Sequence, residues 1–204
     1  MEKTSQKLLF GFICVIALAA GVALALVRTT PVASVSVATV FDEVRPLPAF
    51  ELVDATARSR TTASLEGRWA WLFFGFTACP DVCPATLGIL ASAIDKIDSS
   101  RRPDVYLISV DPERDTPERL ASYVHHFNPA FNALTGPLAE VERLAEGLYA
   151  SFAKVPLDGG GYTMDHFAGI YMVNDKAQVV AISTTPHDAT ALASDYLALR
   201  TENR

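Results

Sequence analysis

The chain has 204 residues and half of them are hydrophobic, which is enough for one ordinary core but leaves little for a second domain. Two basic side chains and one acidic side chain precede Arg28, so the rest of the chain carries 15 basic against 22 acidic residues. This acidic balance argues against nucleic acid as a partner, because nucleic-acid-binding proteins present basic surfaces to the phosphates.

An apolar run from Leu8 to Val27 follows a short leader, residues 1–7. The run has no charged side chain and about the 20 residues that a helix needs to cross a bilayer core, so it predicts a transmembrane anchor. Lys3 and Lys7 favour a cytoplasmic leader, which predicts a bacterial inner-membrane protein whose soluble part faces the periplasm. A cleavable signal peptide is the alternative, because Ala23-Leu24-Ala25 has the small-x-small form of a cleavage site.

Residues 28–48 are rich in Val, Ala, Ser, Thr and Pro and lack helical periodicity, so we expect a tether there. In residues 49–204, segments typical of strands and helices alternate, which predicts a mixed sheet with helices on its faces. The nearly continuous apolar run Trp69 to Phe76 predicts a central strand of a covered sheet. The other expected strands are 50–53, 105–110, 169–173 and 178–182, and the expected helices start near Pro84, Pro117, Pro137 and Leu192.

The glycine-rich stretch Gly159-Gly160-Gly161 predicts a hairpin turn before the strand at 169–173. With it, the elements follow the order strand, helix, strand, helix, hairpin and last helix, with an extra segment before the hairpin. This order predicts a thioredoxin-like α/β fold.

Two cysteines stand where the central strand is expected to end, in the segment Thr77 to Pro84 (TACPDVCP). Because a residue before proline is pushed out of the helical region, Cys79 and Cys83 should both be extended, with the helix starting after Cys83. The thiols then lie near the unpaired N–H groups and positive dipole end of that helix. Such surroundings lower a thiol pKa and favour the thiolate.

This cysteine pair has three interpretations. A structural disulfide explains it poorly, because the loop that it would close is too short to restrain much of the unfolded chain. A redox pair is the second, although the thioredoxin active site has two residues between its cysteines and this one has three. A site for a soft metal, Cu(I) or Zn(II), is the third, and it needs another ligand from elsewhere in the chain.

Histidine could supply that ligand, and the chain has four. We expect His125 and His126 on the surface of the helix that begins at Pro117, and His187 at the turn or cap before the last helix. His166 follows the glycine-rich hairpin and precedes a strand, so in a thioredoxin-like sheet it can face the cysteines. Spacing alone leaves open whether it is a ligand.

Several residues near the cysteines and His166 could support the site or have a purely structural role. Asp81 and Asp165 could orient the ligands or serve local turns. Asp115 and Thr116 are predicted to cap the helix that follows them. Met164 could lend a thioether to a metal, but packing is the expected role.

Three stretches together resemble the signatures of the Sco/SenC family of copper chaperones. They are FGFTACPDVCPATL from Phe74, SVDPERDTPERL at 109–120 and YTMDHFAGIYMV at 162–173, and they occur in the right order. The resemblance covers roughly residues 48–199. Ala78 and Phe167 depart from the residues usual in the family, and neither departure removes a ligand.

The resemblance implies a thioredoxin-like copper-binding domain, 49–204, held to a membrane by an N-terminal helix. It implies that Cys79, Cys83 and His166 bind copper, as Cu(I) or Cu(II). It further implies a carrier that takes copper from an upstream donor and delivers it to the CuA centre of cytochrome c oxidase. The alternative is thiol-disulfide exchange on the cysteines of that oxidase subunit, with Cys79 and Cys83 as the redox pair.

Overall fold

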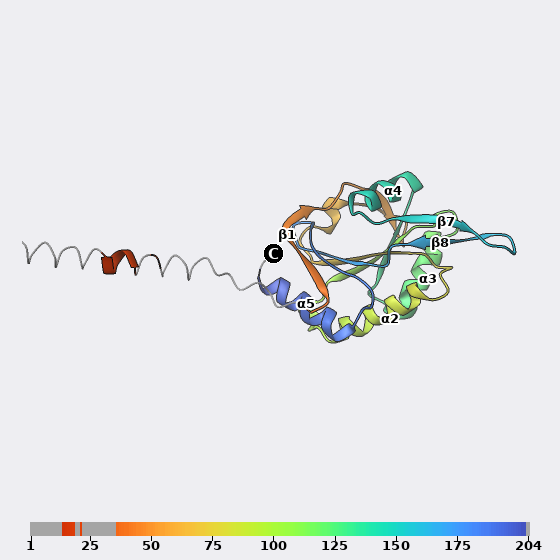
Figure 1. Ribbon diagram of the computed structural model, residues 1–204. Helices are drawn as coiled ribbons and strands as arrows, with labels where there is room; N and C mark the ends of the chain where they lie inside the picture. The colour runs from red at the N-terminus through yellow and green to blue at the C-terminus, as the bar shows by residue number, and fades with distance from the viewer. Residues whose placement is uncertain (1–13, 19–20, 22–35, 203–204) are drawn as a thin grey trace, which may run out of the picture. The chain divides into compact units, whose positions relative to one another are not determined.

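The computed structural model describes residues 14–18, 21 and 36–202. The chain divides into two compact units, Met1–Ala33 and Ser34–Arg204. Residues 14–18 and 21 of the first unit are helical (Figure 1). Among the described residues, no helix combines the length and the apolar character that crossing a bilayer requires. Most of the expected anchor, 8–27, lies outside the described residues.

The second unit is built on a mixed sheet of eight strands in the order β1-β10-β9-β4-β5-β6-β2-β3. Strand β4 lies inside this sheet, parallel to β5 and antiparallel to β9, and all six of its residues are buried. The apolar run is therefore a central strand covered on both faces, as predicted. The strands of the sheet are β1 (Ala38–Pro46), β2 (Glu51–Asp54), β3 (Ser59–Thr61), β4 (Ala70–Gly75), β5 (Asp104–Ser109), β6 (Asn132–Thr135), β9 (Ile170–Val173) and β10 (Gln178–Ser183).

Helices cover both faces of this sheet. In Figure 1, α2, α3 and α5 lie on one side of the sheet, and α4 lies on the other. This mixed, layered arrangement is the thioredoxin-like α/β fold that the order of the elements predicted. The helices are α2 (Val82–Asp95), α3 (Pro117–Phe127), α4 (Leu138–Gly147) and α5 (Ala189–Thr201), with short 3-10 turns η1 (Thr62–Leu65) and η2 (Ser99–Arg101).

Helix α3 shows how local sequence sets these boundaries. The Thr116 side chain caps it by accepting a hydrogen bond from the backbone N–H of Arg119 at 3.3 Å, and Pro117 occupies the first turn. Leu120 and Val124, one turn apart, are both buried. Capping, proline and apolar periodicity therefore agree, and this helix begins where it was predicted to begin.

Strand β1 lies inside the segment 28–48 that was expected to be a tether. It pairs antiparallel with β10 at one edge of the sheet, and most of its residues are exposed. Its register shifts between Val40 and Arg45, so its side chains do not keep the strict alternation that marks a half-buried strand. The folded unit therefore includes residues that precede position 49.

Strands β7 (Phe152–Pro156) and β8 (Tyr162–His166) form a separate two-stranded hairpin that projects from the domain (Figure 1). Its turn contains Gly160 and Gly161 with φ of 86° and 80°, a left-handed conformation that glycine adopts without strain. The predicted hairpin is confirmed, and His166 lies at its base, opposite the first residue of β7.

Candidate metal site

Cys79 and Cys83 lie in the connection between the end of β4 and the first turn of α2. Helix α2 begins at Val82, so the expectation that Cys83 is extended and precedes the helix is wrong. Pro84 shares that first turn, where the N–H that proline lacks would have no partner within the helix. The first turn therefore tolerates proline, and the helix can start before it.

The two sulfur atoms have different surroundings. The backbone N–H of Cys83 donates a hydrogen bond to Cys79 Sγ over 3.3 Å, and Cys79 is half-buried. Cys83 is fully buried against the end of β4. Gly75 makes room for it there, because a Cβ at that position would lie 3.0 Å from Cys83 Sγ. Cys79 is thus the less buried of the two cysteines.

Burial decides the protonation of Cys83. Removal from water raises the pKa of the Cys83 thiol far above its ordinary value, and a backbone hydrogen bond with Phe76 offsets only part of this. The expectation of a lowered thiol pKa is therefore wrong for Cys83, because full burial penalises the thiolate more than the helix N-terminus stabilises it. A metal ion must displace this proton to gain the sulfur as a ligand.

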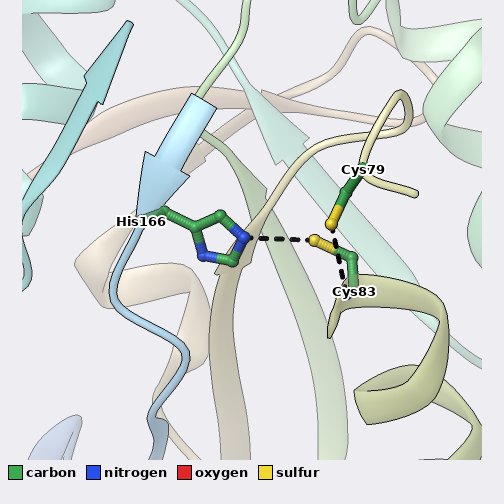
Figure 2. A group of neighbouring side chains, drawn as sticks. All are labelled: Cys79, Cys83 and His166. Carbon is green, nitrogen blue, oxygen red and sulfur yellow. Dashed lines mark hydrogen bonds between the residues drawn. The ribbon is translucent and has the colours of Figure 1, made fainter. Parts of the chain in front are cut away.

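His166, the last residue of β8, faces the cysteines from the hairpin side (Figure 2). Its Nε2 lies 3.3 Å from Cys83 Sγ, and its Nδ1 lies 3.2 Å from the carbonyl oxygen of Phe167. Because a carbonyl only accepts, Nδ1 carries the ring proton and the lone pair of Nε2 points toward the sulfur. Burial lowers the pKa of His166, which keeps the ring in the neutral form that binds metals.

Two aromatic side chains hold the imidazole ring in this orientation. The ring of Phe73 meets that of His166 at 6.0 Å and 75°, and the ring of Phe76 meets it at 5.8 Å and 89°. Both are edge-to-face contacts, the geometry that aromatic rings prefer. The direction in which Nε2 points is therefore fixed by ring packing as well as by the hydrogen bond from Nδ1.

The three side chains converge on one small volume. The sulfur atoms of Cys79 and Cys83 and a ring nitrogen of His166 all lie within 4.8 Å of one another. An open pocket of about 260 Å³ adjoins them, between the cysteine loop and β8. Two sulfurs and one imidazole nitrogen suit copper, whereas a structural zinc site has four protein ligands.

The other histidines lie away from this cluster. His125 and His126 are exposed on α3, as predicted. His187 lies in the turn before α5, where its Nε2 is 2.9 Å from the carbonyl oxygen of Ala168. The cap of that helix is its neighbour Asp188. His187 therefore orders the segment that follows His166 and does not cap the helix.

The carboxylates that flank the candidate ligands are both exposed. Asp81 is the N-cap residue of α2, but its side chain makes no capping hydrogen bond. Asp165 favours the protonated form of the His166 ring through its charge, an effect smaller than that of burial. Met164 is buried in the core, as expected for a packing residue.

Asp115 has a role that the sequence analysis missed. It is buried and accepts hydrogen bonds from the backbone N–H and hydroxyl of Thr77 and from the Ser109 hydroxyl. The prediction of Asp115 as a helix cap is therefore wrong, and Thr116 alone caps α3. Because Thr77 precedes Asp115 by 38 positions, no local pattern could have revealed this contact.

Comparison with known proteins agrees with this geometry. A family model described as SCO1/SenC matches residues 42–199. The human protein named SCO1 homolog, mitochondrial, is 38% identical over 133 residues, which are 63% of this chain and 44% of that protein. The matched part of the chain spans between 43% and 64% of the length of the first curated relatives that it resembles.

Solved structures resemble the domain over most of its length. Arabidopsis thaliana ScoI with copper bound has a TM-score of 0.72 and 34% identity, covering 76% of this chain and 98% of that one. Bradyrhizobium japonicum ScoI with copper bound has a TM-score of 0.68 and 33% identity, covering 74% of this chain and 98% of that one. Both were determined with the metal that the candidate ligand set suits.

Proposed function

This chain belongs to the SCO1/SenC family, and we propose that it binds one copper ion through Cys79, Cys83 and His166. The observation that carries the proposal is the approach of the three ligand atoms to within 4.8 Å of one another, although they come from a helix start and a separate hairpin. Relatives whose structures contain copper support the choice of metal.

The ligand types also favour copper. Thiolates are soft ligands that select Cu(I), and a neutral imidazole suits both Cu(I) and Cu(II). Three ligands satisfy Cu(I). Because the imidazole also suits Cu(II), the same side chains can hold the ion in either oxidation state. The half-buried position of Cys79 leaves one sulfur accessible to an incoming ligand.

We propose that the copper is cargo for the CuA centre of cytochrome c oxidase, taken up from an upstream donor. A carrier must release its ion, and the arrangement supports release because the ligands come from two separate segments. His166 can withdraw with the hairpin while both sulfurs stay on the cysteine loop. Ligand exchange would then begin with the loss of His166 and proceed through Cys79.

Thiol-disulfide exchange on the oxidase subunit is the second candidate. The closeness of the two sulfurs favours it, because a disulfide between Cys79 and Cys83 would need only a small movement. Cys79, the more exposed sulfur, would attack the partner disulfide, and Cys83 would resolve the mixed disulfide. This activity would not require His166, which separates it from copper transfer.

We also propose a place in the cell. The apolar run 8–27 would anchor the chain in a bacterial inner membrane, with residues 1–7 in the cytoplasm and the folded unit in the periplasm. The tether would begin at Arg28 and end where β1 begins, at Ala38. The charge-free apolar run supports this proposal.

Copper titration of the full-length protein in detergent tests the binding proposal. The reduced protein should take up one equivalent of Cu(I) or Cu(II) against a competing chelator. His166→Ala, Cys79→Ser and Cys83→Ser should each weaken binding at least tenfold, the effect of losing about 1.4 kcal/mol. The control is His125→Ala, an exposed histidine. Binding that is indifferent to all three candidate ligands would refute the proposal.

A further inference from the structure

The candidate ligands lie on two segments that meet in the main sheet only beyond His166, where β9 pairs with β4. The cysteines follow β4, whereas His166 ends a hairpin that forms a sheet of its own. At the base of the hairpin, the N–H of Phe167 donates to the carbonyl of Ser151, which closes the hairpin on itself. These hydrogen bonds hold the hairpin together, and the pairing of β9 with β4 places its base, but neither fixes the end of β8 at Tyr162.

The connection between β5 and α3, residues 110–116, contacts the cysteine side of the site through Asp115. This buried carboxylate accepts from the Thr77 N–H at 3.1 Å and from the Thr77 hydroxyl at 2.5 Å. A further bond from Ser109 at 2.7 Å ties the same carboxylate to the end of β5. Thr77 is two residues from Cys79, so Asp115 holds the start of the cysteine loop.

The same connection contacts the hairpin through Arg114 and Asp111. Nη1 of Arg114 donates to the carbonyl of Tyr162 at 3.0 Å, and its guanidinium lies over the Tyr162 ring at 3.9 Å. The Tyr162 hydroxyl donates to Asp111 at 2.8 Å, and Asp111 pairs with Arg114. Backbone, ring and hydroxyl of Tyr162 are therefore all held by two residues of one loop.

Tyr162 begins the strand that His166 ends. Residues two apart in a strand point to the same face, so Tyr162, Met164 and His166 share one face of β8. Met164 is buried in the core, which identifies this face as the one that meets the domain. Fixing Tyr162 and Met164 therefore fixes the register and the tilt with which His166 meets the sulfurs.

We propose that the connection of residues 110–116 is a bracket that sets the distance between the cysteine pair and His166. Asp115 holds the cysteine loop, and Asp111 and Arg114 hold the hairpin. Asp111, Arg114 and Asp115 are thus positioning residues for the metal site and touch no metal themselves. This role rests on the proposed function, in that His166 must be a copper ligand for its position to affect binding.

The chain offers a matched control for this bracket. Lys154 on β7 pairs with Glu113, but its Nζ also lies 4.2 Å from the centroid of the Tyr162 ring, and Glu113 accepts from the Tyr162 hydroxyl at 3.4 Å. Substitution of either residue would therefore disturb the bracket. Arg68 instead pairs with Asp104 at 2.8 Å where β5 begins, at the end of the central strands opposite to the cysteines. The Arg68 side chain is largely exposed, so Arg68→Gln removes a surface ion pair of little energetic weight without touching the bracket.

The test compares Arg114→Gln, Tyr162→Phe and Thr77→Val with Arg68→Gln in the full-length protein in detergent. We expect each of the first three to bind Cu(II) about tenfold more weakly, the effect of one lost hydrogen bond. We also expect weaker imidazole nitrogen coupling in the electron paramagnetic resonance spectrum, because His166 is displaced. In the metal-free protein, Arg114→Gln and Tyr162→Phe should speed hydrogen exchange of the amides at 162–167.

Arg68→Gln should match the unmodified protein in all three measurements. The bracket is refuted if Arg114→Gln and Tyr162→Phe keep the unmodified nitrogen coupling and hairpin exchange, even where affinity falls. Tyr162→Phe removes a single hydroxyl, so it keeps the test valid should Arg114→Gln fail to fold. Absence of nitrogen coupling in the unmodified protein would refute the proposed ligand set instead, and hydrogen exchange in the metal-free variants would then decide the bracket.

Discussion

Nε2 of His166 lies 3.3 Å from Sγ of Cys83, although the two residues are 83 positions apart in the chain. One comes from a hairpin and the other from the first turn of a helix, so only the folded domain brings them together. Nδ1–H of His166 donates to the Phe167 carbonyl, which leaves Nε2 facing the thiol. The metal-free protein thus already holds the nitrogen and the sulfur in a ligand-like arrangement.

The first prediction concerns His166→Ala. The variant should bind Cu(I) at least tenfold more weakly, and it should pass copper to a competing dithiol faster than the unmodified protein. The reason is that loss of the imidazole removes the step in which the hairpin withdraws. Stopped-flow transfer to a chromophoric chelator measures both quantities, with His125→Ala as the control. Equal or slower transfer by His166→Ala would contradict release through this ligand.

The second prediction concerns the space beneath Cys83. In Gly75→Ala, the new Cβ would lie 3.0 Å from Cys83 Sγ and 2.9 Å from Leu107 Cδ1. Overpacking of this kind costs about 1 to 3 kcal/mol of unfolding free energy, and here it also displaces the thiol. We therefore expect lower stability in urea for the metal-free protein, together with weaker copper binding.

Gly88→Ala is the control for this substitution. Gly88 lies in α2, and a Cβ there would meet no heavy atom within 4 Å. Alanine in a helix interior is favoured over glycine by about 0.5 to 1 kcal/mol, so this variant should gain stability and keep its copper affinity. A Gly75→Ala protein as stable as Gly88→Ala would show that the site is less tightly packed than the structure indicates.

The central strand and the start of α3 could be predicted because their signals are local. The run from Trp69 to Phe76 is short and apolar at almost every position, as expected of a strand covered on both faces. Thr116 and Pro117 mark a helix start by their own chemistry. The cysteines were found as candidates from their place after the central strand and His166 from its place after the hairpin, the resemblance implied that the three bind copper together, and the structure places them close to one another.

The errors at Cys83 and Asp115 share a physical cause, which is that burial depends on residues far away in the chain. The dipole of α2 can be inferred from sequence near Cys83, but the packing that raises its pKa comes from Gly75 and neighbouring strands. Asp115 resembles a helix cap in the sequence because its hydrogen-bond partner, Thr77, follows a different strand of the sheet. Strand β1 was predicted as a tether because a largely exposed edge strand lacks the alternating apolar pattern that indicates a strand.

The third prediction concerns stability in acid. Asp54 is buried and accepts hydrogen bonds from Thr56, from the Arg58 backbone and from Arg60. Burial alone would raise the pKa of Asp54, but these bonds outweigh it and hold the pKa well below its ordinary value. Because the folded protein favours the ionised form, the contribution is full above about pH 4, the pKa of a free Asp, and falls as the pH drops below it.

Asp54→Asn should therefore lose about 1 to 3 kcal/mol of unfolding free energy at pH 7, the cost of disrupting buried hydrogen bonds to a charged group. The difference from the unmodified protein should shrink as the pH falls below about 4. Urea denaturation across this pH range measures it, with the exposed Glu66→Gln as the control. A deficit that stays constant with pH would show that the carboxylate charge does not matter.

The last prediction concerns Asp195, which fastens the start of β1 to α5. Its buried carboxylate accepts hydrogen bonds from the backbone N–H groups of Ser36, Val37 and Ala38 at 2.8 to 2.9 Å. Asp195→Asn replaces one acceptor oxygen with a donor, so the three N–H groups cannot all be satisfied. Hydrogen exchange of the amides at 36–40 should quicken at least tenfold, because the free energy of local opening falls by about 1.4 kcal/mol.

Copper affinity should not change in this variant. Strand β1 is separated from β4 by β10 and β9, so loosening that edge leaves the cysteine loop and the hairpin in place. The two measurements together locate the effect: fast exchange with unchanged copper binding means that the edge strand and the metal site are independent. A parallel loss of copper affinity would mean that the attachment of β1 to α5 also supports the site, and the separation of the two by strand order would have to be abandoned.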